Sequence, residues 1–179
     1  MARVSLIEED GHPELADLIG AIRGARRGRL INVYKLLLHS PALAESWFAH
    51  NNAVRWKTAL DGRLRELVII RIGHLTRVAY IVRQHVPNLA LPEGLTLEEC
   101  DALTAWESST LFGARDRAVL GYVDCMTRDV QVPDAVFAAL KPHFDERQIV
   151  ELTVLIGTYN MHARVMQALE IDPERSETR

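Results

Sequence analysis

The apolar residues of this chain recur at intervals of three and four positions in almost every segment. This interval places them on one buried face of an α-helix, and no stretch shows the period-two alternation, bounded by hairpin turns, that a half-buried strand needs. The pattern predicts an all-α fold, a compact multi-helix single domain over residues 1–179 with a charged, frayed tail from about Asp172. Helical segments are predicted over residues 14–22, 30–39, 41–60, 63–75, 76–86, 96–106, 115–128, 133–140 and 149–169.

Local signals mark where several of these helices begin. Thr96 and Glu99 have the spacing of a capping box, in which a hydroxyl and a carboxylate each accept a hydrogen bond from the other residue's backbone N–H. Asp145 and Gln148 repeat that spacing before the longest periodic segment. The residues from Gly73 onward leave two alternatives open, because they could either break the helix or only bend it.

Composition and charge exclude several classes of function. The 21 Lys and Arg against 24 Asp and Glu give a net charge of −3, which provides no general attraction to nucleic acid or anionic membranes. No apolar run approaches the roughly 20 residues of a membrane span, and the N-terminal residues lack the apolar core of a signal peptide, so a cytoplasmic location is expected. The histidines and two cysteines show no metal-ligand spacing, and the glycines match no phosphate loop, so neither a metal nor a cofactor is predicted.

The residues best suited to chemistry are Glu66, which opens an apolar helix, and His85, nineteen positions later on the next helical segment. An acid that fixes an imidazole in one tautomer makes it a general acid or base near neutral pH. Each residue also has a structural alternative: Glu66 could pair with a neighbouring arginine, and His85 could simply end its helix before Pro87. Tyr80, one turn before Gln84, is a further candidate, although it could equally be a packing residue.

The chain resembles the carboxymuconolactone decarboxylase and alkylhydroperoxidase D family from about Leu30 to Leu169. The resemblance rests on Arg63-Leu64-Arg65-Glu66-Leu67-Val68-Ile69, on the placement of Tyr80 and Gln84-His85, and on Gly157-Thr158-Tyr159-Asn160-Met161-His162-Ala163-Arg164. It implies an all-helical protein that assembles into homo-oligomers, trimers or hexamers, with active sites beside the subunit contacts. Fold alone does not determine the reaction.

The chain departs from the family pattern at positions that carry chemistry. The peroxidase branch has a Cys-x-x-Cys whose two positions are occupied here by Val78 and Ile81. Without a thiolate there is no peroxide nucleophile, and Cys100 and Cys125 lie elsewhere. The cysteine-free decarboxylase branch commonly has Tyr-Glu-Trp before the His, and only Tyr80 of that triplet is matched here.

The retained residues favour a cofactor-independent lyase or isomerase of the carboxymuconolactone decarboxylase type. It would act on a small organic acid or lactone, such as one from aromatic-compound breakdown, with His85 as proton shuttle, Glu66 as its partner, and Tyr80 or an arginine stabilising the enolate. The alternative is a catalytically inactive family member that serves as an oligomeric binding or scaffold protein. A thiol peroxidase ranks third.

Two further groups invite both functional and structural interpretations. Tyr159, Asn160 and Arg164 could bind a substrate carboxylate, but interhelical hydrogen bonding that fixes subunit packing is the favoured interpretation. His162, one step off their face, is expected to face solvent. A basic cluster could be an anion site or an RNA contact, but a solvated loop is the favoured interpretation. The cluster comprises Arg23, Arg26, Arg27 and Arg29.

Overall fold

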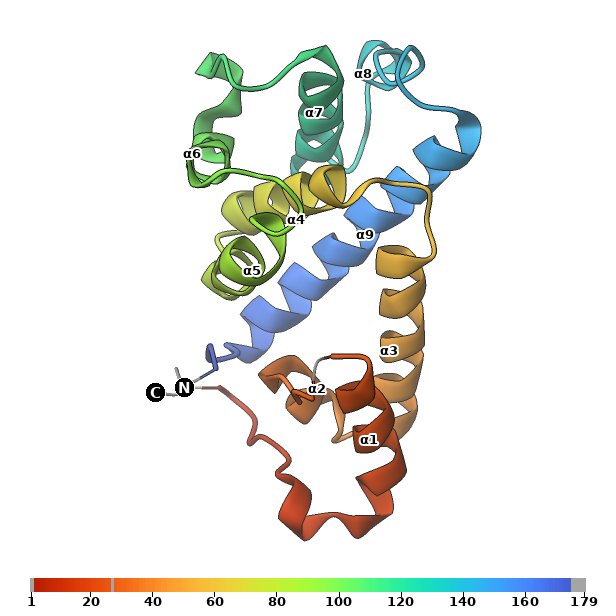
Figure 1. The fold of residues 1–179 in the computed structure, drawn as a ribbon, viewed down its shortest axis with the longest axis vertical. Helices are drawn as coiled ribbons and strands as arrows, with labels where there is room; N and C mark the ends of the chain where they lie inside the picture. Colours follow the sequence, from red (N-terminus) through yellow and green to blue (C-terminus); the bar gives the residue numbers. More distant parts are fainter. Residues whose placement is uncertain (1, 27, 175–179) are drawn as a thin grey trace.

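The computed structural model describes residues 2–26 and 28–174, and all regular structure within them is helical, which confirms the predicted all-α fold (Figure 1). Of four short 3-10 or π turns, η1 (Glu9–Gly11) and η2 (Pro13–Leu15) precede α1, η3 (Val86–Ala90) follows α5, and η4 (Leu103–Ser108) follows α6. The α-helices are α1 (Ala16–Gly24), α2 (Asn32–Leu37), α3 (Pro41–Trp56), α4 (Gly62–Thr76), α5 (Ala79–His85), α6 (Leu97–Ala102), α7 (Ala114–Arg128), α8 (Asp134–Ala138) and α9 (Glu146–Leu169).

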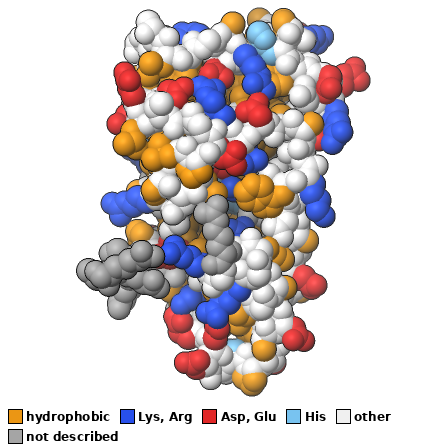
Figure 2. All heavy atoms as spheres, viewed as in Figure 1, with side chains coloured by type: hydrophobic (Ala, Val, Ile, Leu, Met, Phe, Trp, Pro, Cys, Tyr) orange, Lys and Arg blue, Asp and Glu red, His pale blue; other side chains and the backbone are white. Residues whose placement is uncertain are grey.

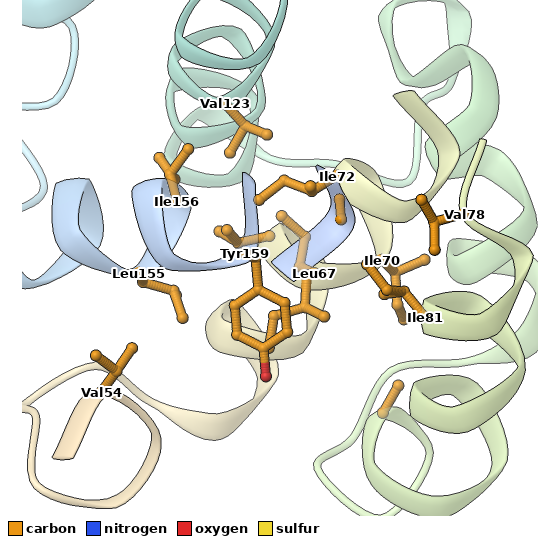
Figure 3. Packing of buried hydrophobic residues seen from close by; sticks show 14 of the residues in the cluster. Val54, Leu67, Ile70, Ile72, Val78, Ile81, Val123, Leu155, Ile156 and Tyr159 are labelled. Carbon is orange, nitrogen blue, oxygen red and sulfur yellow. The ribbon is translucent and has the colours of Figure 1, made fainter. Parts of the chain in front are cut away.

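Helix α4 forms the centre of the molecule. Every residue from 64 to 73 is buried, and the helix packs against α5, α7 and α9. Figure 3 shows Leu67 and Ile72 of α4 among side chains from these neighbours, including Val123 of α7 and Ile156 of α9. A helix surrounded in this way has no wet face, which explains why its apolar run is continuous rather than periodic.

The chain between α4 and α5 breaks the helix rather than bending it. Arg77 takes a left-handed conformation with φ of 58°, and its backbone N–H bonds the carbonyls of the last turn of α4. Gly73 lets α5 approach closely, because a Cβ there would lie only 3.0 Å from a methyl of Val82. This tight return places α5, and with it His85, directly against α4.

Helix α9 runs diagonally between two groups of helices, with α4, α6, α7 and α8 on one side and α1, α2 and α3 on the other (Figure 1). The capping box of Asp145 and Gln148 is present at its start, and that of Thr96 and Glu99 is present at α6, so both predictions are confirmed. Unlike α4, α9 keeps an exposed apolar stripe in the single chain. The stripe comprises Val150, Val154 and Met161.

The two ends of the described chain meet beside α9 (Figure 1). The backbone N–H of Arg3 bonds the carbonyl of Leu169 at 2.9 Å, and that of Ala2 bonds the Asp172 carboxylate at 2.8 Å. The segment predicted as a frayed tail therefore begins with docked residues, and positions 175–179 lie outside the described part. On the face in Figure 2, basic and acidic side chains are interspersed. Over the described residues, no helix combines the length and apolar character needed to cross a membrane.

Candidate active site

The structure brings Glu66 and His85 together at the buried contact between α4 and α5. The Oε2 of Glu66 lies 2.6 Å from Nδ1 of His85, and the glutamate has no exposed surface. This geometry holds the imidazole in one orientation and leaves its second nitrogen, Nε2, for other partners. Nε2 bonds no other group among the described residues.

Two buried arginines hold Glu66 from the opposite side. Nη2 of Arg55 on α3 donates to Oε1 of Glu66 at 3.0 Å, and Nε of Arg65 lies 3.4 Å from the same oxygen. Burial acts to raise the pKa of Glu66, but interactions with His85, Arg55 and Arg65 outweigh it and lower the pKa to about 2. Glu66 is therefore ionised at neutral pH although it is fully enclosed.

His85 is the neutral partner of this pair. Burial lowers its pKa, and although the Glu66 charge acts in the opposite direction, the net shift remains downward, helped by Arg55 and Arg26. A neutral imidazole that donates through Nδ1 to a carboxylate carries its lone pair on Nε2. His85 is thus arranged as a base.

A hollow of about 1230 Å³ lies beside this pair, and His85 forms part of its wall. Its other walls come from the N-terminal segment at residues 8–10, the end of α1 and the segment after it, α2, α3, α5, η3, α9 and Glu174. Among the described residues, three side-chain atoms are buried without a hydrogen-bond partner, and the three residues that carry them all line this hollow. Because unpaired buried polar atoms are costly, these residues are candidates to bind a polar ligand in the hollow. They are Nε of Arg26, Oδ1 of Asn51 and Nε2 of His162.

Tyr159, predicted to bind substrate, lies in the hollow next to His85. Their rings meet edge to face at 5.5 Å, and Nη1 of Arg55 donates to the Tyr159 hydroxyl at 2.7 Å. In Figure 3 the ring lies beside Leu67, and its oxygen points away from Val123 and Ile156. Burial raises the pKa of Tyr159 against the opposing effect of Arg55, so the hydroxyl keeps its proton and can donate it.

The prediction that His162 faces solvent is wrong. The side chain is 3% exposed, and its ring stacks on Trp47 at 4.4 Å and lies 4.9 Å from the Tyr159 ring. Burial, reinforced by nearby His85, His50 and two arginines, lowers its pKa to about 3. The helical period set His162 apart from the face of Asn160 and Arg164 and therefore predicted exposure. Because α9 is covered on more than one side, that neighbouring face is enclosed as well.

The remaining predicted site residues occupy different surroundings. Tyr80 lines the hollow, but its hydroxyl donates to Glu174 at 2.5 Å, and burial together with that carboxylate raises its pKa. Asn160 bonds Thr127 and accepts from Arg164 at 2.8 Å. Neither Asn160 nor Arg164 lines the hollow, so the structure does not bring them to the Glu66 and His85 pair, and their contacts fix helix packing.

The basic cluster divides between the hollow and the solvent. Arg26 donates to the Tyr34 hydroxyl at 2.8 Å, and its guanidinium lies 4.6 Å from the centre of that ring. Arg23 and Arg29 also line the hollow but are exposed, and Arg27 lies outside the described residues. Arg26 therefore belongs to the site rather than to a purely solvated loop.

Sequence reasoning missed four residues of this site: Arg55, Trp47, Asn51 and His162. The first three lie on α3 and face the hollow, whereas the sequence offered no reason to link that helix with Glu66. Their spacing of four, from 47 to 51 to 55, is the one signal that places them on a single helix face.

No thiol accompanies the Glu66 and His85 pair. Val78 and Ile81, at the positions where thiols would stand, are packed apolar side chains. Cys100 is buried elsewhere, and burial raises its pKa to about 11, which suppresses the thiolate. Neither Cys100 nor Cys125 lines the hollow.

Comparison with known sequences agrees with the resemblance. The model of the carboxymuconolactone decarboxylase family matches residues 41–124. The uncharacterized protein YnjA of Escherichia coli is 31% identical over 118 residues, which are 65% of this chain and 64% of that protein. The uncharacterized protein YdfG of Bacillus subtilis is 25% identical over 115 residues, covering 63% of this chain and 78% of that protein. The chain thus matches less than two thirds of the length of the E. coli relative.

Solved structures share the fold. An uncharacterized peroxidase-related protein from Silicibacter superposes with a TM-score of 0.83 at 20% identity, over 98% of this chain and 93% of that one. ATU0492, a protein of unknown function from Agrobacterium tumefaciens, superposes with a TM-score of 0.74 at 26% identity, over 79% of this chain and 97% of that one. A variant of the debrominase Bmp8, in complex with 2,3,4-tribromopyrrole, superposes with a TM-score of 0.78 at 15% identity, over 97% of this chain and 94% of that one.

Proposed function

From the match of residues 41–124 to the carboxymuconolactone decarboxylase family, which lies within the resemblance predicted for residues 30–169, we propose that the chain is a cofactor-independent lyase or isomerase. Its substrate is a small organic acid or lactone with an acidic proton next to a carbonyl group. The observation that carries the proposal is that the base His85, fixed by buried Glu66, borders a hollow lined by residues with unpaired polar atoms.

The reaction begins with proton removal, because the neutral His85 offers the Nε2 lone pair. Nε2 takes the proton from the carbon next to the carbonyl, and the electrons of that C–H bond move to the carbonyl oxygen as an enolate. The imidazolium that forms lies against the ionised Glu66 at 2.6 Å, which stabilises it. The same proton is then available for return to carbon at another position.

Tyr159 is placed to stabilise the enolate oxygen. Its hydroxyl accepts a hydrogen bond from Arg55, which makes the Tyr159 O–H a better donor through cooperative polarisation. The hydroxyl proton has no acceptor among the described residues. Tyr159 takes the role first considered for Tyr80, whose hydroxyl is engaged by Glu174.

Solvent deuterium exchange tests this proposal, because the exchange requires only the first proton transfer and not the complete reaction. A panel of keto acids and carboxylated lactones is incubated with the protein in D₂O, and proton NMR follows loss of the signal next to the carbonyl. We expect exchange of at least one panel member, reduced by at least 100-fold in His85→Gln, in line with the usual contribution of a general base. Exchange should stay level as pH falls through 6.5, because the His85 pKa is lowered.

The matched control is His143→Gln, since His143 is exposed and remote from the hollow. Equal exchange in wild type and His85→Gln would reject His85 as the base. Absence of exchange across the panel would favour the alternative of an inactive oligomeric binding or scaffold protein. Thiol-dependent peroxidase activity predicts peroxide consumption that disappears when Cys100 and Cys125 are both changed to serine, and the buried environment of Cys100 argues against that result.

A further inference from the structure

The carboxylate of Glu174 projects from the segment after α9 to residues that line the hollow. Its Oε1 accepts hydrogen bonds from the Tyr80 hydroxyl at 2.5 Å and from the backbone N–H of Asn32 at 2.9 Å. Its Oε2 accepts a bond from Nε2 of Gln84. One carboxylate thus receives donors from α5 and from the start of α2, and all three side chains, Tyr80, Gln84 and Glu174, belong to the wall of the hollow.

These groups are hydrogen-bond donors that the two acceptor oxygens of a carboxylate can satisfy together. Three donors converge, and they offer both oxygens of the carboxylate a partner. Tyr80 is 6% exposed, so without an acceptor its hydroxyl would be left in a largely dry environment. The positive charge of Arg26 acts on Tyr80 and on His85, and Arg26 has no carboxylate partner among the described residues.

We propose that Tyr80, Gln84 and the Asn32 N–H form a carboxylate-binding subsite, that Glu174 occupies it as a tethered substitute, and that a carboxylate substrate binds by displacing Glu174. The inference rests on the proposed function, because it assigns the substrate class of the same hollow. Gln84 and His85 both line the hollow, so a carboxylate held by Gln84 lies in the same hollow as the base. Tyr80 is then a binding residue.

Among the described residues, the displacement requires movement of Pro173 and Glu174 only. The Asp172 carboxylate accepts from the backbone N–H of Ala2, and its carbonyl accepts from the Asn32 side chain at 3.0 Å. These bonds anchor the segment two residues before Glu174. A swing of Pro173 and Glu174 about Asp172 therefore opens the subsite while the docking of the two chain ends is retained.

Calorimetric titration with benzoate tests the proposal, with benzamide as the neutral probe of the same shape. A tethered carboxylate competes at an effective concentration in the millimolar range, so its removal should expose the subsite. We expect Glu174→Ala to bind benzoate at least tenfold more tightly than wild type, and benzamide binding to be unchanged. Adding Tyr80→Phe to Glu174→Ala should abolish the gain.

The control is Glu45→Ala, which removes the same charge from an exposed position of α3 outside the hollow. Equal benzoate affinity in wild type and Glu174→Ala, an equal gain for benzamide, or a gain in Glu45→Ala would overturn the proposal. Calorimetry needs no turnover, so benzoate binding that depends on Glu174 and Tyr80 supports the subsite even if no deuterium exchange occurs. If deuterium exchange is observed but benzoate binding does not depend on Glu174 and Tyr80, the subsite is rejected and the proposed function is retained.

Discussion

Replacement of His162 should change how the stability of the protein depends on pH. The folded chain holds this imidazole at a pKa of about 3, whereas its ordinary value is 6.5, because burial and the neighbouring His85, His50, Arg26 and Arg55 oppose its protonation. Between these two values the unfolded chain binds a proton that the folded chain does not. The contribution of neutral His162 is thus complete above pH 6.5 and is lost as the pH falls toward 3.

The magnitude follows from the same two values. A pH of 5 is about 1.5 units below the pKa of His162 in the unfolded chain and well above its pKa in the folded chain. Each unit corresponds to about 1.36 kcal/mol. Wild type should therefore lose about 2 kcal/mol of unfolding free energy through His162 between pH 7.5 and pH 5. For a chain of this size that loss corresponds to a fall of roughly 4–8 °C in Tm.

Urea unfolding of wild type and His162→Phe at pH 7.5 and pH 5 measures this loss. Phenylalanine retains a flat ring against Trp47 but cannot bind a proton. The pH-dependent loss should be smaller by about 2 kcal/mol in His162→Phe, whatever the substitution costs at pH 7.5. His143→Phe, at an exposed position, should retain the wild-type dependence. If wild type and His162→Phe lose equal stability on acidification, the imidazole is not held neutral in the fold.

Three further substitutions test the ion cluster and the helix packing. Glu66→Gln should lower the free energy of unfolding by roughly 3–5 kcal/mol, because it leaves two buried guanidinium groups without their shared carboxylate. Urea unfolding measures the loss. A change below about 1 kcal/mol would contradict the buried ion cluster. Gly73→Ala should destabilise the protein by about 1–3 kcal/mol, because the added Cβ meets Val82 at 3.0 Å. Gly121→Ala, where the added Cβ meets open space, should stabilise it by about 0.5–1 kcal/mol. Thermal unfolding should therefore show a lower Tm for Gly73→Ala and a higher Tm for Gly121→Ala.

The sequence was sufficient for the helices because their determinants are local. The capping boxes at Thr96 and Asp145 depend on residues three positions apart, and the structure forms both. The predicted end of the third segment, near Leu60, lies beyond the observed end of α3 at Trp56. Helix ends without a strong capping signal depend on what the chain meets next, and no local pattern encodes that.

The site was only partly predictable, because half of it depends on contacts between distant helices. Glu66 and His85 could be found from their residue types, spacing and family resemblance. Arg55 lies on α3 and reaches both Glu66 and Tyr159, which is 104 positions further along the chain. Only the diagonal course of α9 past α3 produces that contact, and periodicity within either helix does not reveal it (Figure 1).

Packing accounts for the side chain at Val78 but not for the one at Glu66. Val78 and Ile81 fill the positions of a thiol pair with well-packed apolar side chains, 3% and 1% exposed. A buried ion cluster, by comparison, offers little net stability, because apolar residues of similar volume often serve a core equally well or better. The chain nevertheless holds the ionised Glu66 between Arg55 and His85. Packing alone therefore accounts for Val78 and Ile81, whereas it does not account for the buried ion cluster around Glu66, which is what the proposed role of His85 as a base requires.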